Sequence, residues 1–127
     1  MQISVFGTKE DTYYSAVISH AYYSIFYAAK SYLLTKGIKT GAPEEHKKTF
    51  EEFKKLVDKG VLDVELLKIY ECMLVKADTL LHIFEFEKGK RGRFTYRRIP
   101  QANQEPANES IRNAKTFFKH IYTLCQK

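Results

Sequence analysis

The sequence predicts one all-α domain, an antiparallel up-and-down bundle of four to five helices. Apolar residues recur every three or four positions in four separate segments, and this is the period of a helix face. Glycine or proline residues separate the first three segments from one another. A length of 127 residues suits a single domain over 1–127, and no stretch is apolar enough to cross a membrane.

The first predicted helix extends from about Thr8 to Lys36. Residues at spacings of three or four form one continuous stripe along it: Tyr13, Val17, Ala21, Ser24, Ala28 and Tyr32. Further aromatic residues, such as Tyr22 and Tyr23, lie outside this stripe, so we expect a central helix with neighbours on several sides. Gly37 is expected to end the helix, because glycine adopts the left-handed cap conformation without strain.

Two further helices are predicted in the middle of the chain. The second helix begins near Pro43, since a proline in the first turn removes no hydrogen bond, and it ends at Lys59 and Gly60. Asp63 is expected to cap the third helix. The third helix has the clearest amphipathic pattern in the chain: Leu67, Tyr70, Leu74, Ala77, Leu81 and Phe84.

The pattern after Phe84 supports two interpretations. Residues 84–87 and 93–97 alternate between apolar and charged types around a segment that contains Gly89 and Gly92, which is typical of a β-hairpin. Alternatively, the third helix continues to about Glu87 and a loop follows. In either case residues 88–105 form a basic insert before the last helix, and connections of this length are usually functional or mobile.

The last predicted helix begins between Pro106 and Asn108. Its expected apolar stripe contains Ile111, Ala114, Phe118, Ile121 and Cys125. The two cysteines, Cys72 and Cys125, form no Cys-x-x-Cys pair, and we expect both to be buried, reduced thiols of a cytoplasmic protein. The first six residues lack the basic start and long apolar run of a signal peptide.

The basic insert gives the clearest functional signal in the residues themselves. The net charge of the chain is +6, and six cations lie in one acid-free stretch: Lys88, Lys90, Arg91, Arg93, Arg97 and Arg98. These cations can neutralise phosphates, while Phe94 and Tyr96 offer surfaces on which unpaired bases stack. The insert therefore indicates binding of a nucleotide or single-stranded RNA. The alternative is a solvated segment whose aromatic residues pack on the bundle.

The chain resembles the HEPN domain family through an ordered set of marks along most of its length. They are the segment His20–Ala29 with its Ala-Tyr-Tyr core, Gly37-Ile38, His46 with Phe50 and Phe53, Gly60, Ala77-Asp78, and Ala114 with Phe117 and Phe118. The resemblance implies a bundle of four to five helices that is commonly a homodimer. It also implies work on nucleotides or RNA, often beside a nucleotidyltransferase partner in toxin–antitoxin pairs.

Some members of this family are metal-independent ribonucleases with an Arg-x(4–6)-His motif, and the resemblance implies two candidate pairs here. Lys76 and His82 have this spacing, with lysine in place of the arginine that holds the phosphate and histidine in the proton-transfer position. Lysine cannot reproduce the planar bidentate grip of arginine. The alternative pair is Arg112 and His120, followed by Tyr122; it lies about two turns, or ~12 Å, apart on one helix, so it could share a phosphate only across a dimer interface.

The four histidines fall one on each predicted helix, yet they do not form a metal-binding motif. Neither Glu-x-x-His nor His-Glu-x-x-His occurs, so we expect no metal site and no cofactor. We expect His20 to be a core or interface residue and His46 to fix the start of the second helix. Three functions stay open: a nucleotide- or RNA-binding module, a metal-independent ribonuclease, and a purely structural dimerisation domain.

Overall fold

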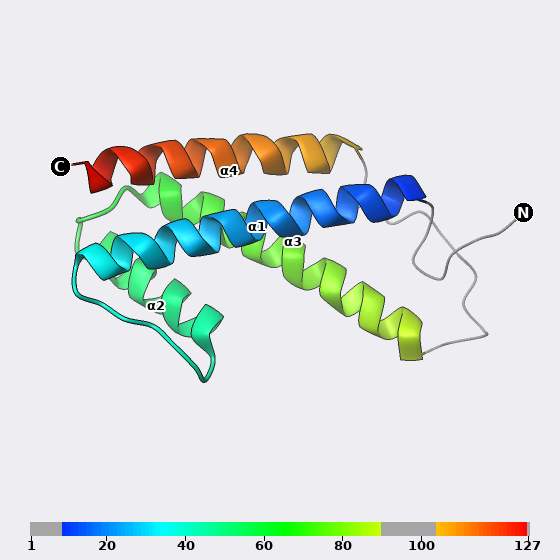
Figure 1. Cartoon of the computed structure of the whole chain (residues 1–127), viewed down its shortest axis with the longest axis horizontal. Helices are drawn as coiled ribbons and strands as arrows, with labels where there is room; N and C mark the ends of the chain where they lie inside the picture. The colour runs from blue at the N-terminus through cyan, green and yellow to red at the C-terminus, as the bar shows by residue number, and fades with distance from the viewer. Residues whose placement is uncertain (1–8, 90–103, 127) are drawn as a thin grey trace, which may run out of the picture.

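The described part of the chain forms a bundle of four helices. The computed structural model describes residues 9–89 and 104–126, with side chains at 13–80 and 104–126. The helices are α1 (Lys9–Thr35), α2 (Glu45–Asp58), α3 (Val64–Gly89) and α4 (Gln104–Cys125), shown in Figure 1. The predicted all-α bundle is confirmed. Within the described ranges, none of these helices has the length and apolar character needed to cross a membrane.

Helix α1 is the central element, as predicted, because it packs on each of the other three helices, and more extensively than α3 does. Residues on several of its faces are buried: Ile18, Tyr22, Ile25, Phe26, Ala29 and Leu33. The helix ends as expected at Gly37, which has a φ of 77°. The N–H of Ile38 donates to the carbonyl of Leu33 over 2.9 Å, so the carbonyl groups of the last turn keep hydrogen-bond partners.

The directions of the helices depend on the link between α1 and α2. Helix α3 runs opposite to α1 and α4, whereas α1 and α4 lie side by side and run in the same direction (Figure 1). The link 36–44 folds back along α1, so that Glu45 pairs with Lys30 well before the end of α1. A buried hydrogen bond of 2.6 Å between the hydroxyls of Thr40 and Thr49 holds the link against α2.

An aromatic cluster joins the other three helices. Phe53 of α2, Tyr70 of α3 and Phe117 of α4 are fully buried, with ring centroids 5.4–5.9 Å apart. Aromatic pairs at such separations add stability beyond the area that they bury. The hydroxyl of Tyr70 is also buried, and it has no hydrogen-bond partner in the part of the chain that the structure describes.

The start of α3 agrees with the prediction, and its end decides between the two interpretations. Asp63 caps the helix, since its Oδ1 accepts a hydrogen bond of 2.9 Å from the N–H of Glu65. The helix continues to Gly89, so the β-hairpin interpretation is wrong and the longer helix is confirmed. No glycine or proline interrupts α3 before Gly89. Residues 90–103 of the basic insert lie outside the described residues.

The buried face of α4 differs from the predicted stripe. The buried residues are Ala107, Ser110, Phe117 and Ile121, whereas Ile111, Phe118 and Cys125 are exposed. Both stripes satisfy the helical spacing, so periodicity alone could not separate them. Ser110 enters the core because its hydroxyl donates to the carbonyl of Pro106 over 2.8 Å. Cys72 is exposed as well, so the expectation of two buried thiols is wrong.

Candidate functional site

A mainly apolar cleft that also carries several polar side chains lies where the middle of α1, the start of α2 and the middle of α3 meet. Its volume is about 360 Å³, within the usual range of small-molecule sites. The three helices together contribute two phenols, an imidazole, a carboxylate and a hydroxyl, beside three apolar side chains. The lining residues are Ser19, Tyr22, Tyr23, His46, Leu74, Ala77, Asp78 and Leu80.

A hydrogen bond between α1 and α2 sets the chemistry of this cleft. The hydroxyl of Tyr22 and Nδ1 of His46 are 2.9 Å apart. Burial, with a smaller effect from the neighbouring Tyr23 phenol, raises the pKa of Tyr22 to about 12, so this hydroxyl keeps its proton at neutral pH. When the Tyr22 hydroxyl donates, His46 accepts at Nδ1 and the ring hydrogen is at Nε2. The imidazole can then donate that hydrogen to a ligand.

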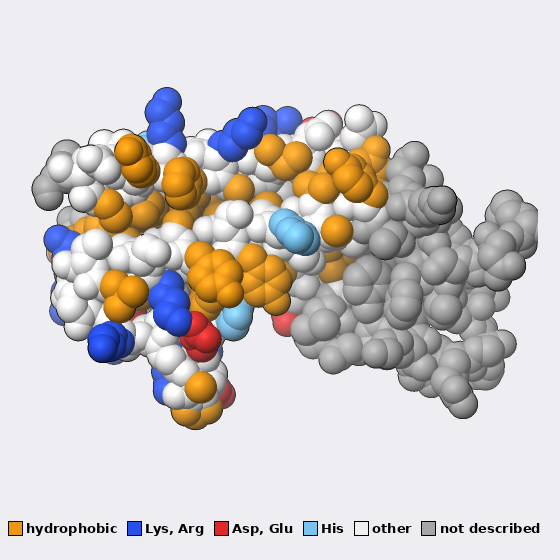
Figure 2. Space-filling view, in the orientation of Figure 1, with side chains coloured by type: hydrophobic (Ala, Val, Ile, Leu, Met, Phe, Trp, Pro, Cys, Tyr) orange, Lys and Arg blue, Asp and Glu red, His pale blue; other side chains and the backbone are white. Residues whose placement is uncertain are grey.

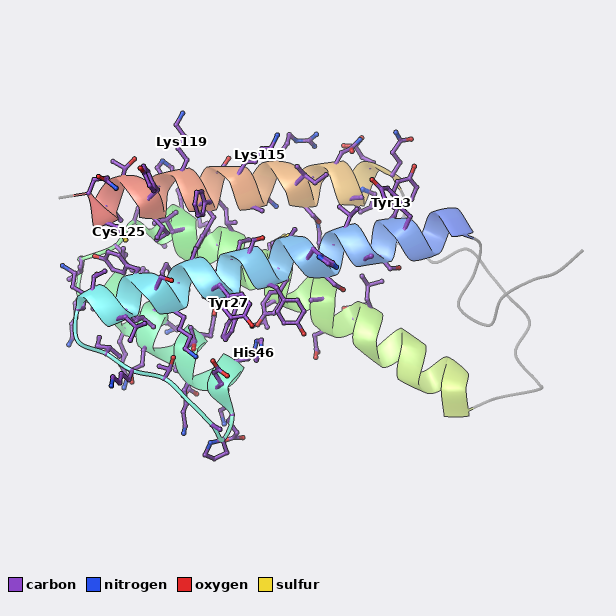
Figure 3. All side chains as sticks on the ribbon, viewed as in Figure 1. Tyr13, Tyr27, His46, Lys115, Lys119 and Cys125 are labelled. Atoms are coloured by element: carbon purple, nitrogen blue, oxygen red, sulfur yellow. The ribbon has the colours of Figure 1, made fainter. Side chains whose placement is uncertain are left out.

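Aromatic contacts fix the orientation of the imidazole. The ring of His46 stacks on Phe26 with centroids 3.9 Å apart and an interplanar angle of 13°. The edge of Tyr23 meets the same ring at 5.7 Å and 75°. His46 thereby holds the start of α2 against α1, as predicted, although the residue itself is exposed. Figure 3 shows His46 and Tyr27 on the same side of α1.

The ion pair next to His46 strengthens this junction. Lys30 of α1 donates a hydrogen bond to Glu45, the first residue of α2. This bond, together with the attraction of the lysine charge, holds the pKa of Glu45 below its usual value. The pair lies one residue from the imidazole, so α1 and α2 are joined by both a charged and an aromatic contact at the cleft.

The charge of the cleft suits a base better than a phosphate. Asp78 supplies a carboxylate, and no lysine or arginine is among the lining residues. Cations lie further along α3, because the basic insert begins at Lys88, ten residues after Asp78 on the same helix. At the rise of an α-helix this separation is about 15 Å.

The two cations predicted to hold a phosphate are both ion-paired. Lys76 of α3 donates to Glu109 of α4, and this hydrogen bond is the main reason that the pKa of Glu109 lies below its usual value. Nη2 of Arg112 donates to Glu105 over 3.2 Å. The backbone of His82 is helical, but its side chain lies outside the described residues, as do the side chains of the basic insert.

The alternative catalytic residues on α4 do not reach the cleft. His120 and Tyr122 are exposed, and Tyr122 stacks on Phe118 at 6.2 Å. All cleft residues come from α1, α2 and α3. His20 was expected to be either a core or an interface residue. It is exposed, so the core expectation is wrong, and it lies along the groove between α1 and α4.

Sequence reasoning did not assign a binding role to this cleft. The sequence nevertheless contained a signal of the cleft. Three of the marks that carry the family resemblance meet there although they are far apart in the chain: Tyr22-Tyr23, His46 and Ala77-Asp78. Only the folded bundle brings them together. Among the described side chains, the structure contains no group of three or more His, Cys, Asp or Glu residues that could hold a metal ion.

The fold and the cleft define a small helical-bundle domain with a candidate binding site between its first three helices. The family model of the HEPN domain matches residues 7–123, nearly the whole chain, and the chain belongs to this family. Comparison with curated proteins and with solved structures gives no significant match. Membership of the HEPN family supports a function connected with nucleotides or RNA in general.

Proposed function

We propose that this chain is a binding module for a nucleotide or single-stranded RNA, with a base held in the cleft between α1, α2 and α3. The main support for this proposal is that Tyr23 and His46 have exposed rings at the cleft; Tyr23 is 47% exposed. Aromatic rings stack on bases, and each such contact contributes about 1–3 kcal/mol. A base that stacks on these rings would displace water from ring faces that contacts within the protein already hold in place.

The polar groups of the cleft match the edge of a base. Nε2 of His46 can donate a hydrogen bond when Nδ1 accepts from Tyr22, and the carboxylate of Asp78 is an acceptor. Adenine, cytosine and guanine carry exocyclic amino groups that donate to such an acceptor, whereas uracil offers only its ring N3–H. The proposal therefore favours a base with an amino group over uracil.

The basic insert would supply the contacts to phosphates that the cleft lacks. It follows α3 directly, and its first cation stands about 15 Å along the helix from Asp78. A base in the cleft and phosphates on the insert could belong to one short RNA strand. The two parts of the proposal make separate predictions, because stacking is insensitive to salt and phosphate contacts are not.

The cleft is tested by binding of AMP, CMP, GMP, UMP and a labelled single-stranded RNA, measured by calorimetry and fluorescence anisotropy. Tyr23→Ala and His46→Ala should each weaken binding roughly tenfold, the equivalent of one lost stacking contact. Tyr13→Ala removes an exposed tyrosine of the same helix outside the cleft and should bind normally. Circular dichroism checks that each variant is folded. Unchanged affinity in both cleft variants would refute the proposed site.

The insert is tested by the salt dependence of RNA binding. Replacing Arg91, Arg93, Arg97 and Arg98 with alanine removes four cations. The slope of log K against log salt concentration should become shallower by about 3, since each phosphate contact to a single strand contributes roughly 0.7. An unchanged slope would show that these arginines do not contact phosphate, while leaving the cleft proposal intact.

We further propose that the chain acts with a nucleotidyltransferase partner in a pair of the toxin–antitoxin kind. This part is supported by the family alone. Its test is co-expression with a nucleotidyltransferase encoded beside it, followed by size-exclusion chromatography of the mixture. Separate elution of the two proteins at micromolar concentration would remove the partner from the proposal without affecting base binding.

A further inference from the structure

Two tyrosines of α1 form an exposed aromatic surface next to the cleft. Tyr23 lines the cleft, and Tyr27 stands one helical turn further toward the end of α1. The two rings stack with centroids 6.5 Å apart and an interplanar angle of 30°. Figure 2 shows hydrophobic side chains side by side over the middle of α1, next to a histidine. Tyr27 is 59% exposed and does not line the cleft, so base binding in the cleft leaves its ring unused.

Contacts within the protein hold the ring of Tyr27 in position. Tyr27 makes a T-shaped contact with Phe26, with centroids 5.0 Å apart and an interplanar angle of 63°. Phe26 is buried and also stacks on His46, so one buried ring supports both residues. These two supported residues lie on the same side of α1 (Figure 3). A ligand on Tyr27 would therefore meet a surface that is already ordered, which lowers the entropic cost of binding.

Polar groups surround the ring of Tyr27. Ser24 and Ser31 stand one helical turn before and after it, and both are exposed. Lys30 is bonded to Glu45, so the charges beside the ring are of opposite sign. A nucleic acid base has the matching chemistry, because it combines a flat π-face with hydrogen-bonding groups along its edge.

We infer that Tyr27 forms a second base-binding position, so that the site binds two consecutive nucleotides of a single strand more tightly than it binds a mononucleotide. One base lies in the cleft against Tyr23 and His46, and its neighbour in the strand stacks on Tyr27. The 6.5 Å between the two tyrosine rings is about twice the spacing of stacked bases, which neighbouring nucleotides of an unstacked strand can span. This inference rests on the proposed function, because its first position is the cleft.

The place of Tyr27 also gives the course of the strand. Helix α3 runs opposite to α1, so Tyr27 and the end of α3, where the basic insert begins, lie on opposite sides of the cleft (Figure 1). The nucleotide in the cleft is then an internal one, with its neighbour on Tyr27 at one side and the insert at the other. Lys30 is bonded to Glu45, so Tyr27 contributes stacking rather than a phosphate contact, and its contribution should be insensitive to salt.

The test compares two ligands that differ only in the second base: the dinucleotide ApA, and an analogue that lacks one adenine but keeps its sugar. Both carry the same phosphodiester, so the ratio of their affinities, measured by calorimetry, isolates the second base. ApA should bind roughly tenfold more tightly, with the same ratio at low and high salt. A ratio of about two or less, the statistical gain from a second identical base, would overturn the inference and leave the cleft proposal standing. Absence of binding by both ligands would refute the cleft and the inference together.

Three variants assign the gain to the ring of Tyr27. Tyr27→Ala should lower the ratio to about two, whereas Tyr27→Phe keeps the ring and should keep the roughly tenfold ratio. Tyr13→Ala removes another exposed tyrosine of α1 and should also keep it. Circular dichroism checks that each variant is folded. An unchanged ratio in Tyr27→Ala, or an equal loss of affinity for both ligands, would show that Tyr27 holds no second base.

Discussion

Removal of the Tyr70 hydroxyl is expected to stabilise the protein. Tyr70 is fully buried between Phe50, Phe53 and Phe117, and its hydroxyl has no hydrogen-bond partner among the described residues. Burial also raises the pKa of this phenol far above its usual value, which shows how poorly the site solvates charge. Tyr70→Phe keeps the ring and its packing and removes only the hydroxyl.

The expected size follows from the cost of burying an unpaired polar group. A hydroxyl that gives up its hydrogen bonds to water on folding costs about 1–3 kcal/mol in measured proteins. A small void left by the lost oxygen offsets part of this gain. We therefore expect Tyr70→Phe to raise the free energy of unfolding by about 1 kcal/mol, and the midpoint of thermal unfolding by roughly 3–5 °C.

Tyr22→Phe is the matched control, because Tyr22 is also buried but its hydroxyl is hydrogen-bonded to His46 at 2.9 Å. Its removal should lower the free energy of unfolding by about 0.5–1.5 kcal/mol, the net value of a typical hydrogen bond. The same chemical change is thus expected to have opposite signs at two buried tyrosines. Both substitutions keep the ring and replace tyrosine with phenylalanine in a helix, so changes in ring packing or helix propensity would not produce opposite signs.

Urea unfolding followed by circular dichroism at 222 nm measures both variants. Equal m-values for the variants and the unmodified protein are required before the free energies are compared. If Tyr70→Phe is less stable than the unmodified protein by 0.5 kcal/mol or more, the hydroxyl has a favourable partner and the reasoning fails. It fails equally if Tyr22→Phe is as stable as the unmodified protein.

Two other predictions follow from the ion pairs on α4. Because Lys76 lowers the pKa of Glu109, the stability from this pair is present above about pH 4.5, the ordinary value, and is lost as the pH falls through the lowered pKa. Glu109→Gln should lower the free energy of unfolding by less than about 1 kcal/mol at pH 7 and have no effect near pH 2, measured by urea unfolding. Single-stranded RNA should stay intact in EDTA, since the cations of both predicted catalytic pairs are bound to glutamates. Cleavage that His82→Ala or His120→Ala abolishes would contradict this and support a ribonuclease.

The sequence determined the class of fold and most helix boundaries. Apolar residues at the helical period can be recognised without knowledge of the tertiary structure. The cap at Asp63 and the left-handed glycine at Gly37 can be predicted as well, because both act within one turn of the chain. The central place of α1 was also predictable, since its apolar residues exceed what a single face can hold. These properties are local or depend on composition alone.

The end of α3 and the buried face of α4 were decided by the folded chain. Alternation over four residues after Phe84 suits a strand, yet a helix that is already propagating gains a hydrogen bond with each added residue and continued to Gly89. On α4, two stripes satisfied the same period. The stripe that contains Phe117 is the buried one, because Phe117 completes the aromatic cluster with Phe53 and Tyr70.

The cleft could not be derived from the sequence, because its residues come from three helices and the fold-back of residues 36–44 brings them together. That link places His46 against Tyr22, 24 positions earlier, and α3 then adds Asp78. Periodicity groups the residues of each helix into faces, but it does not show which helix stands opposite a given face. The sequence by itself therefore determined the helical segments and the caps at Asp63 and Gly37, while tertiary packing alone decided which polar side chains share a site and which face of α4 is buried.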